Sequence, residues 1–143
     1  MATKSVTIDN KSFDISYEVV NPSSKKDIIF LHGWGSNKDI MKNVFSPYLK
    51  DFRHIYIDLP GFGKSLNNYV LTTNDYVKIV DEFLNLITSS KDIIAGHSYG
   101  GKVATLLNPK KINFKFLEEQ IKQLKELKFP TSDATSQVVE IGS

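Results

Sequence analysis

The chain has 143 residues, of which 41% are hydrophobic and 24% are charged, and this composition is ordinary for one globular domain with its own core. Eighteen Lys and Arg residues nearly balance sixteen Asp and Glu residues, and no basic stripe points to a nucleic-acid partner. Cysteine is absent, which excludes disulfides and thiolate metal sites. Because we recognise neither a signal-peptide pattern nor an apolar run of membrane-spanning length, we expect a cytoplasmic protein with no membrane partner.

The N-terminal region shows the alternation of apolar and polar residues that is typical of strands. Val6 and Ile8 alternate with polar neighbours, a turn is expected at residues 9–12, and a second alternating run spans residues 13–19. This pattern predicts an antiparallel hairpin with one buried face. Residues 28–31 then form a continuous apolar run, which predicts a buried strand of a parallel sheet.

Two amphipathic helices are predicted on either side of the next strand. The first is expected to begin at Ser36 and to be kinked or restarted by Pro47. A strand is predicted at residues 54–58, and a second helix is expected to begin at Thr72 or Thr73. This alternation of strands and helices favours an α/β fold with a parallel sheet and helices on both of its faces.

A short glycine-bounded motif lies between the apolar run 92–95 and a predicted helix. Its residues, Gly96 to Gly100, have the pattern G-x-S-x-G, with Ser98 at the centre. In the order strand, motif, helix, this pattern is typical of a nucleophile elbow. Small residues two before and two after the serine let strand and helix approach, and the hydroxyl is raised above the sheet near the positive end of the helix. A structural serine in a turn is the alternative interpretation.

Two further motifs accompany the elbow, and each follows a predicted strand. They are Leu-His-Gly-Trp-Gly at residues 31–35 and Asp-Leu-Pro-Gly-Phe-Gly-Lys-Ser at residues 58–65. In this order the three motifs resemble the α/β-hydrolase superfamily, in particular its small ester and carbon–carbon-bond hydrolases of the meta-cleavage-product type. The resemblance covers residues 3–110. It implies a mostly parallel sheet of α/β-hydrolase type that begins with an antiparallel hairpin.

The resemblance also implies roles for individual residues. Ser98 matches the nucleophile, and the backbone N–H groups of Trp34 and Tyr99 match the oxyanion hole. The predicted substrate-binding positions are His32, Gly33, Trp34 and Tyr99, and neither a metal nor an organic cofactor is implied. We favour His32 as a structural residue that pins its loop, and the Trp34 ring is predicted to be either core or pocket wall.

The chain departs from the family's pattern after the elbow. In the family a catalytic acid and then a histidine follow the nucleophile, but no histidine follows Ser98 here. The chain therefore resembles the front half of a hydrolase domain, residues 1–110, truncated after the elbow helix and joined to an atypical helical tail, residues 111–143. Two functions stay open. One is an impaired serine hydrolase acting on a small-molecule ester or ketone-type substrate, and the other is a non-catalytic remnant or half-domain that acts in binding or association.

The tail contains two predicted elements. Phe114, Leu117, Ile121 and Leu124 repeat at helical spacing and predict an amphipathic helix over residues 114–128. Residues 138–141 predict a short final strand. One edge of the elbow strand would otherwise be open, and an open apolar edge favours self-association. Either tail element is a candidate to cover that edge.

Overall fold

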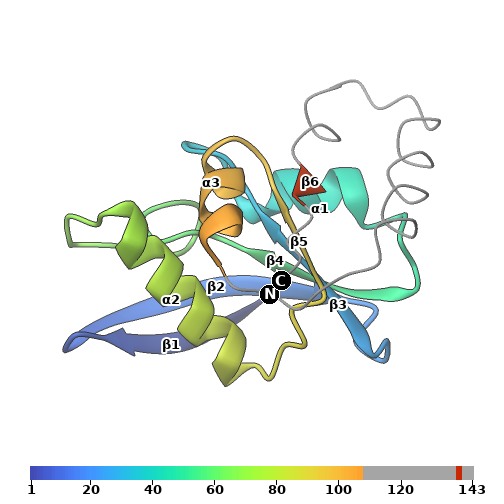
Figure 1. Ribbon diagram of the computed structural model, residues 1–143, viewed down its shortest axis with the longest axis horizontal. Coiled ribbons are helices and arrows are strands. Elements are labelled where there is room, and N and C mark those ends of the chain that lie inside the picture. The colour runs from blue at the N-terminus through green and yellow to red at the C-terminus, as the bar shows by residue number, and fades with distance from the viewer. Residues whose placement is uncertain (108–137, 140–143) are drawn as a thin grey trace.

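The computed structural model of the chain describes residues 1–107 and the backbone of residues 138 and 139. The elements appear in Figure 1 in the order β1 (Ala2–Ile8), β2 (Lys11–Val20), β3 (Lys26–Leu31), α1 (Lys38–Phe45), β4 (Phe52–Ile57), α2 (Thr73–Leu86), β5 (Ile93–Gly96), α3 (Tyr99–Leu106) and β6 (Val138–Val139). The helix predicted at residues 114–128 lies outside the described residues. In the described part of the chain, no helix has both the length and the apolar character that a membrane crossing needs.

The strands form one mixed sheet in the order β1-β2-β4-β3-β5-β6. Strands β4, β3 and β5 are parallel and occupy its centre, while β1 and β2 form the predicted antiparallel hairpin and β2 joins β4 antiparallel. The predicted α/β fold is therefore confirmed. Its parallel part is confined to the central strands, because both outer regions of the sheet pair antiparallel.

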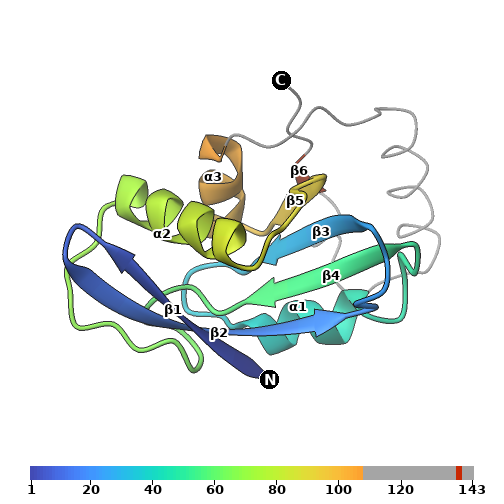
Figure 2. The ribbon, with the colours of Figure 1, turned by 90° about the horizontal axis from the view of Figure 1, so that it is seen from below.

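The two faces of the sheet carry separate hydrophobic clusters. Successive residues of a strand point to opposite faces. Accordingly Ile29 and Leu31 pack with α2 and α3, whereas Ile28 and Phe30 pack with α1. Figure 2 shows α2 and α3 on one side of the central strands and α1 on the other. Helices on both faces, as predicted from the sequence, are confirmed.

The helix starts are set by side-chain caps. The α2 helix follows the predicted cap, because the Thr72 hydroxyl accepts from the Asp75 N–H and the Asp75 carboxylate accepts from the Thr72 N–H. The α1 helix begins at Lys38, two residues after the predicted start at Ser36, because the Asn37 side chain caps it.

The prediction that Pro47 lies inside a helix is wrong. The α1 helix ends at Phe45, and Ser46 is its C-cap. The ring of a proline clashes with a helical conformation of the residue before it, so a helix tends to end there.

The N-terminal ends of β3 and β4 are joined by a buried ion pair. Arg53 donates from Nε and Nη2 to the two carboxylate oxygens of Asp27, at 2.6 and 2.7 Å, and Ser89 Oγ and the Ser90 N–H donate to the same carboxylate. Burial by itself raises the pKa of Asp27, but the bonds from Arg53, Ser89 and Ser90 outweigh it and hold that pKa below its ordinary value. The contact fastens the loop after α2 to the end of the sheet opposite the motif loops.

The open edge of β5 is partly covered by the chain itself. Strand β6 pairs antiparallel with β5, with Val139 opposite Ile94 and Val138 opposite Ala95. The predicted final strand is thus confirmed for its two described residues. Self-association through this edge and the division at residue 110 both stay predictions.

Candidate functional site

Ser98 occupies a strained turn between β5 and α3. Its backbone has φ +54° and ψ −116°, a combination that side-chain-bearing residues rarely adopt and that costs about 1–3 kcal/mol. The residue is exposed, as predicted for a serine raised above the sheet. The strand–turn–helix predicted around Ser98 is therefore confirmed as local structure.

Glycine is required on both sides of this turn because backbones approach closely there. A Cβ atom at Gly96 would lie 2.4 Å from the Gly100 carbonyl oxygen. A Cβ atom at Gly100 would lie 2.1 Å from the Leu31 carbonyl oxygen and 2.5 Å from that of His32. The start of α3 therefore rests against the ends of β5 and β3, and only residues without a side chain allow this contact.

The loop after β3 lies against the Ser98 turn. The His97 N–H donates to the Leu31 carbonyl oxygen at 3.0 Å, which extends the pairing of β5 with β3 by one residue. A Cβ atom at Gly33 would lie 3.3 Å from the Ser98 Cβ atom and 3.2 Å from His97 Nδ1. The two motifs therefore meet at the carboxyl ends of the parallel strands, where α/β proteins place their ligands.

His32 is buried and holds its loop in place. Its Nδ1 donates to the Gly33 carbonyl oxygen at 2.7 Å, and its Nε2 accepts from the Leu59 N–H at 3.0 Å. His54 is also buried, and its ring nitrogens bond Tyr56 and the Leu49 carbonyl oxygen. Both histidines therefore have both ring nitrogens engaged within the fold, which agrees with the structural role expected for them.

The Ser98 hydroxyl forms no hydrogen bond with any histidine of the chain in the structure described for residues 1–107. His32 and His54 use both ring nitrogens elsewhere, as shown above. His97 is the neighbour of Ser98 in the chain, and its ring lies toward Gly33. The prediction that none of the three acts as a hydrogen-bonded base for Ser98 agrees with this geometry.

The two buried histidines make stability depend on pH. Burial holds the pKa of His32 and of His54 below the ordinary value, and a proton on His32 Nε2 would displace the bond from the Leu59 N–H. Below about pH 6.5 the unfolded state therefore binds protons on these two histidines more readily than the folded state does. We expect the free energy of unfolding to be constant from pH 8 to 7 and to fall between pH 6.5 and 5, with a limiting slope of about 1.4 kcal/mol per pH unit for each histidine. Urea unfolding across this range measures it, and a flat profile would contradict the prediction.

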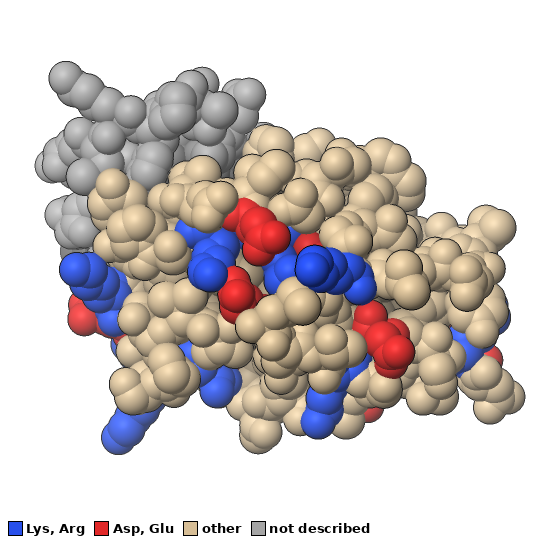
Figure 3. Space-filling model, turned by 180° about the vertical axis from the view of Figure 1, so that it is seen from behind, with Lys and Arg blue, Asp and Glu red and all other residues tan. Residues whose placement is uncertain are grey.

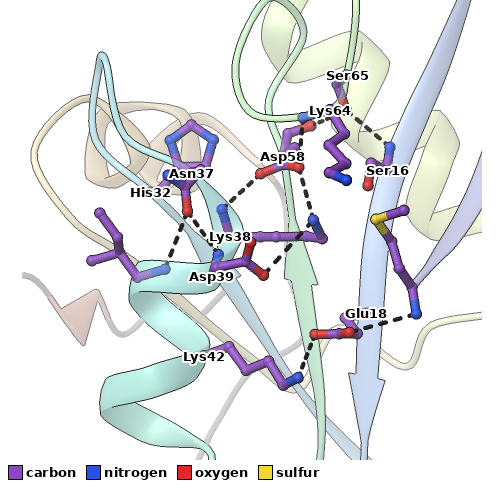
Figure 4. Close-up of polar contacts among 12 residues, drawn as sticks. Ser16, Glu18, His32, Asn37, Lys38, Asp39, Lys42, Asp58, Lys64 and Ser65 are labelled. Carbon is purple, nitrogen blue, oxygen red and sulfur yellow. Dashed lines mark hydrogen bonds and ion pairs between the residues drawn. The ribbon is translucent and has the colours of Figure 1, made fainter.

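A buried carboxylate links the loop after β4 to the start of α1, near the motif loops (Figure 4). Asp58, directly after β4, accepts from the Lys38 N–H at 2.7 Å, from Lys38 Nζ at 3.0 Å and from the Lys64 N–H at 3.0 Å. Its own carbonyl oxygen accepts from the Ser65 hydroxyl, which in turn accepts from the Ser16 N–H. We call this set the Asp58 clamp. It joins the start of α1 to the loop 58–65 and to β2.

The sequence reasoning missed Lys38 as a member of the site region. The side chain is only 2% exposed, although a lysine in the first turn of an amphipathic helix is ordinarily solvated. The signal available in the sequence was Asp58, a carboxylate at the end of a buried strand, which needs a partner when it is buried.

Four aromatic rings from different elements meet beside the Ser98 turn, and we call them the aromatic cluster. Their edge-to-face contacts join Trp34 to Phe62 at 4.8 Å, to Tyr99 at 5.1 Å and to Tyr76 at 6.2 Å between ring centroids. Trp34 is 64% exposed, so of the two predicted alternatives its ring is not core. Its ring instead lies largely open to solvent.

On one face of the molecule, charge does not mark out a ligand surface among the described residues. On the face seen in Figure 3, basic and acidic side chains are interspersed. Among the described residues, no group of three or more His, Asp or Glu side chains could hold a metal ion.

The family of this chain is shown by sequence comparison. The family described as having the alpha/beta hydrolase fold matches residues 27–113, which include all three motif loops. The chain therefore belongs to the alpha/beta hydrolase family.

Several relatives and solved structures are similar to it. A Mycoplasma pneumoniae protein that carries an esterase/lipase name is 34% identical over 103 residues, which is 70% of this chain and 36% of the relative. The pimeloyl-[acyl-carrier protein] methyl ester esterase of Pseudoalteromonas atlantica is 33% identical over 89 residues, or 60% of this chain and 34% of the enzyme. The crystal structure of an alpha/beta superfamily hydrolase from Oenococcus oeni has a TM-score of 0.60 and 31% identity, covering 74% of this chain and 38% of that one. The chain thus spans about a third of the length of the curated relatives it matches.

Proposed function

We propose that this chain carries the nucleophile half of an esterase-type serine hydrolase site, with Ser98 as the nucleophile. The observation that carries the proposal is the strained, exposed turn of Ser98, held at φ +54° where strand and helix meet. Strain of this kind is retained where the surrounding structure enforces it and a function uses it. The relatives named as esterases support an ester of a small molecule as the substrate class.

In the proposed reaction the Ser98 hydroxyl oxygen attacks the ester carbonyl carbon, and its proton passes to solvent water. The carbonyl oxygen becomes negatively charged and accepts hydrogen bonds from the backbone N–H groups of Trp34 and Tyr99. As the first residue of α3, Tyr99 has an N–H without an intrahelical acceptor. The alcohol then leaves with a proton, and water releases the acid from the acyl-serine.

His32 and Gly33 serve this site differently within the proposal. Gly33 leaves room for the Ser98 turn, since any side chain there would meet His97 and Ser98. His32 is buried with both ring nitrogens engaged, so it positions the loop and does not contact the substrate.

The proton of Ser98 has no acceptor among the histidines of the 143 residues. None lies beyond position 97 in the sequence, and none bonds the Ser98 hydroxyl in the described structure. This observation favours a second candidate function, a half-domain that binds an ester-like ligand or another chain without turning it over. It also means that the isolated chain is expected to be a poor catalyst, because a serine needs a base to become a strong nucleophile.

The proposal is tested with p-nitrophenyl acetate and the purified 143-residue chain. We expect slow release of nitrophenol, at most on the order of 10³-fold over water, together with an acetyl group that peptide mass spectrometry locates on Ser98. Ser98→Ala should lose both signals. Ser23→Ala, a change in the exposed turn before β3, should keep them.

The outcomes separate the parts of the proposal. Equal nitrophenol release by Ser98→Ala and the unchanged chain, with no acetyl group on Ser98, would reject Ser98 as the nucleophile and leave the binding half-domain. Rapid, Ser98-dependent turnover with a rate that rises near pH 7 would mean that a histidine does act as the base.

A further inference from the structure

The residues proposed as oxyanion donors also carry rings that touch each other. The ring centroids of Trp34 and Tyr99 lie 5.1 Å apart, and their planes meet at 79°. A carbonyl oxygen held by the two backbone N–H groups would therefore have aromatic side chains beside it. A group carried by the carbonyl would then have this aromatic surface within reach.

Two rings of the cluster are held in place by contacts of their hydroxyl groups. The Tyr76 hydroxyl donates to the Pro60 carbonyl oxygen at 3.3 Å, and the Tyr99 and Thr73 hydroxyls are 3.0 Å apart. Tyr76 and Tyr99 also meet edge to face at 5.6 Å. A surface that is already ordered costs little conformational entropy on binding.

The cluster leaves its largest ring open to solvent. Trp34 is 64% exposed, whereas Tyr76 behind it is 4% exposed. Exposed aromatic surface gains free energy when an apolar group covers it. Among the described residues, the cation placed over an aromatic ring is Lys11 above Tyr69, outside the cluster. Nothing in the cluster itself favours a charged substituent.

From this juxtaposition we propose that the aromatic cluster is the acyl-chain site, and that it selects esters of apolar acyl groups several carbons long over acetyl esters and over acyl groups that end in a carboxylate. The proposal rests on the proposed role of Ser98, because that role places the carbonyl carbon beside Trp34. Trp34 acts in two ways, through its backbone N–H on the oxyanion and through its ring on the chain.

Trp34 is the single tryptophan of the sequence, so its fluorescence reports on this surface directly. Methyl ketones imitate the ester without being hydrolysed. We expect 2-decanone to shift the Trp34 emission at a concentration at least about tenfold lower than 2-butanone, because its longer chain removes more apolar surface from water. The carboxylate 9-oxodecanoate should bind at least about tenfold more weakly than 2-decanone, since its charge would lose water without gaining a partner. Equal concentrations for all three ligands would reject the proposal.

A second measurement uses Ser98 itself. The rate of Ser98 acylation at pH 9 is compared for p-nitrophenyl acetate and p-nitrophenyl hexanoate by mass spectrometry. Trp34→Ala, which keeps the backbone N–H, should lose at least about tenfold more in the hexanoyl rate than in the acetyl rate. Trp34→Phe should recover most of the hexanoyl rate. Leu66→Ala, a change at an 80% exposed apolar side chain outside the cluster, should alter neither rate.

The two measurements distinguish failure of this inference from failure of the proposed function. Acylation of Ser98 at rates that do not depend on chain length, or equal losses for both esters in Trp34→Ala, would overturn the acyl-chain site and leave the nucleophile in place. Ligand binding that favours 2-decanone, without any acyl group on Ser98, would support the apolar site and overturn the nucleophile.

Discussion

Replacing Asp58 with asparagine is expected to lower the free energy of unfolding by about 3–5 kcal/mol, the cost of removing one partner of a buried ion pair. The side chain is 1% exposed, and that of Lys38 is 2% exposed. Asparagine has nearly the same shape, but it leaves the buried Lys38 ammonium with only the exposed Asp39 carboxylate, 3.9 Å away, as a counter-charge. The Asp58 carboxylate now accepts from Lys38 and from the Lys64 N–H. The amide NH₂ of asparagine would face at least one of these donors and could not accept from it.

Asp39→Asn is the matched control, because this carboxylate also lies near Lys38. It is 62% exposed and 3.9 Å from Lys38 Nζ, so its loss is expected to cost less than about 1 kcal/mol. Urea unfolding at pH 7 measures both changes. Adding Lys38→Met to Asp58→Asn should recover part of the stability, since the buried ammonium that has lost its buried partner is then gone. Similar losses for Asp39→Asn and Asp58→Asn would refute the clamp's importance.

The features that the sequence predicted are those set by neighbours along the chain. The turn at Ser98 follows from an apolar strand, two glycines and a helix in immediate succession. The start of α2 follows from Thr72 and Asp75, which are three residues apart and complete their cap locally. The antiparallel hairpin is equally local, because its two strands are joined by a short turn.

The features that the sequence did not predict depend on contacts between distant segments. Lys38 and Asp58 are twenty residues apart, and nothing in the local pattern around Lys38 distinguishes a buried lysine from a solvated one. Trp34 fitted both core and pocket wall, because its exposure depends on how Phe62 and Tyr76 pack behind it. The α1 boundary was displaced because Ser36 and Asn37 are both good caps and only the fold selects one.

The loop after β3 has contacts both beside the Asp58 clamp and with the Ser98 turn. His32 is bound to the backbone of Leu59, next to the clamp, while Gly33 touches the Ser98 turn. The loop that carries Trp34 is therefore held at both of its contacts before a substrate binds. The proposed oxyanion hole needs donors that are fixed in this way, because they would stabilise a developing negative charge without rearranging.

Replacing Gly100 with alanine tests whether the turn depends on the close approach of backbones. In an ordinary helix this change stabilises, because alanine is favoured over glycine by about 0.5–1 kcal/mol. Here we expect the opposite sign and a loss of about 3 kcal/mol, at the upper end for overpacked sites. The new Cβ atom would lie 2.1 Å from the Leu31 carbonyl oxygen and 2.5 Å from that of His32, and both are backbone atoms at the end of a central strand. Helix α3 must move away, and Ser98 moves with it.

Two readouts follow the displacement, the free energy of unfolding and the rate of Ser98 acetylation by p-nitrophenyl acetate. Lys102→Ala, at an exposed position of α3, is the control and should change neither. Gly33→Ala should give an intermediate result, because its contacts of 3.2–3.3 Å with His97 and Ser98 require a shift of only a few tenths of an ångström. We expect it to cost less than about 1 kcal/mol while still slowing acetylation, because the strain falls on the proposed nucleophile. A Gly100→Ala chain that is more stable than the unchanged chain and is acetylated at the same rate would show that the reactivity of Ser98 does not depend on this packing.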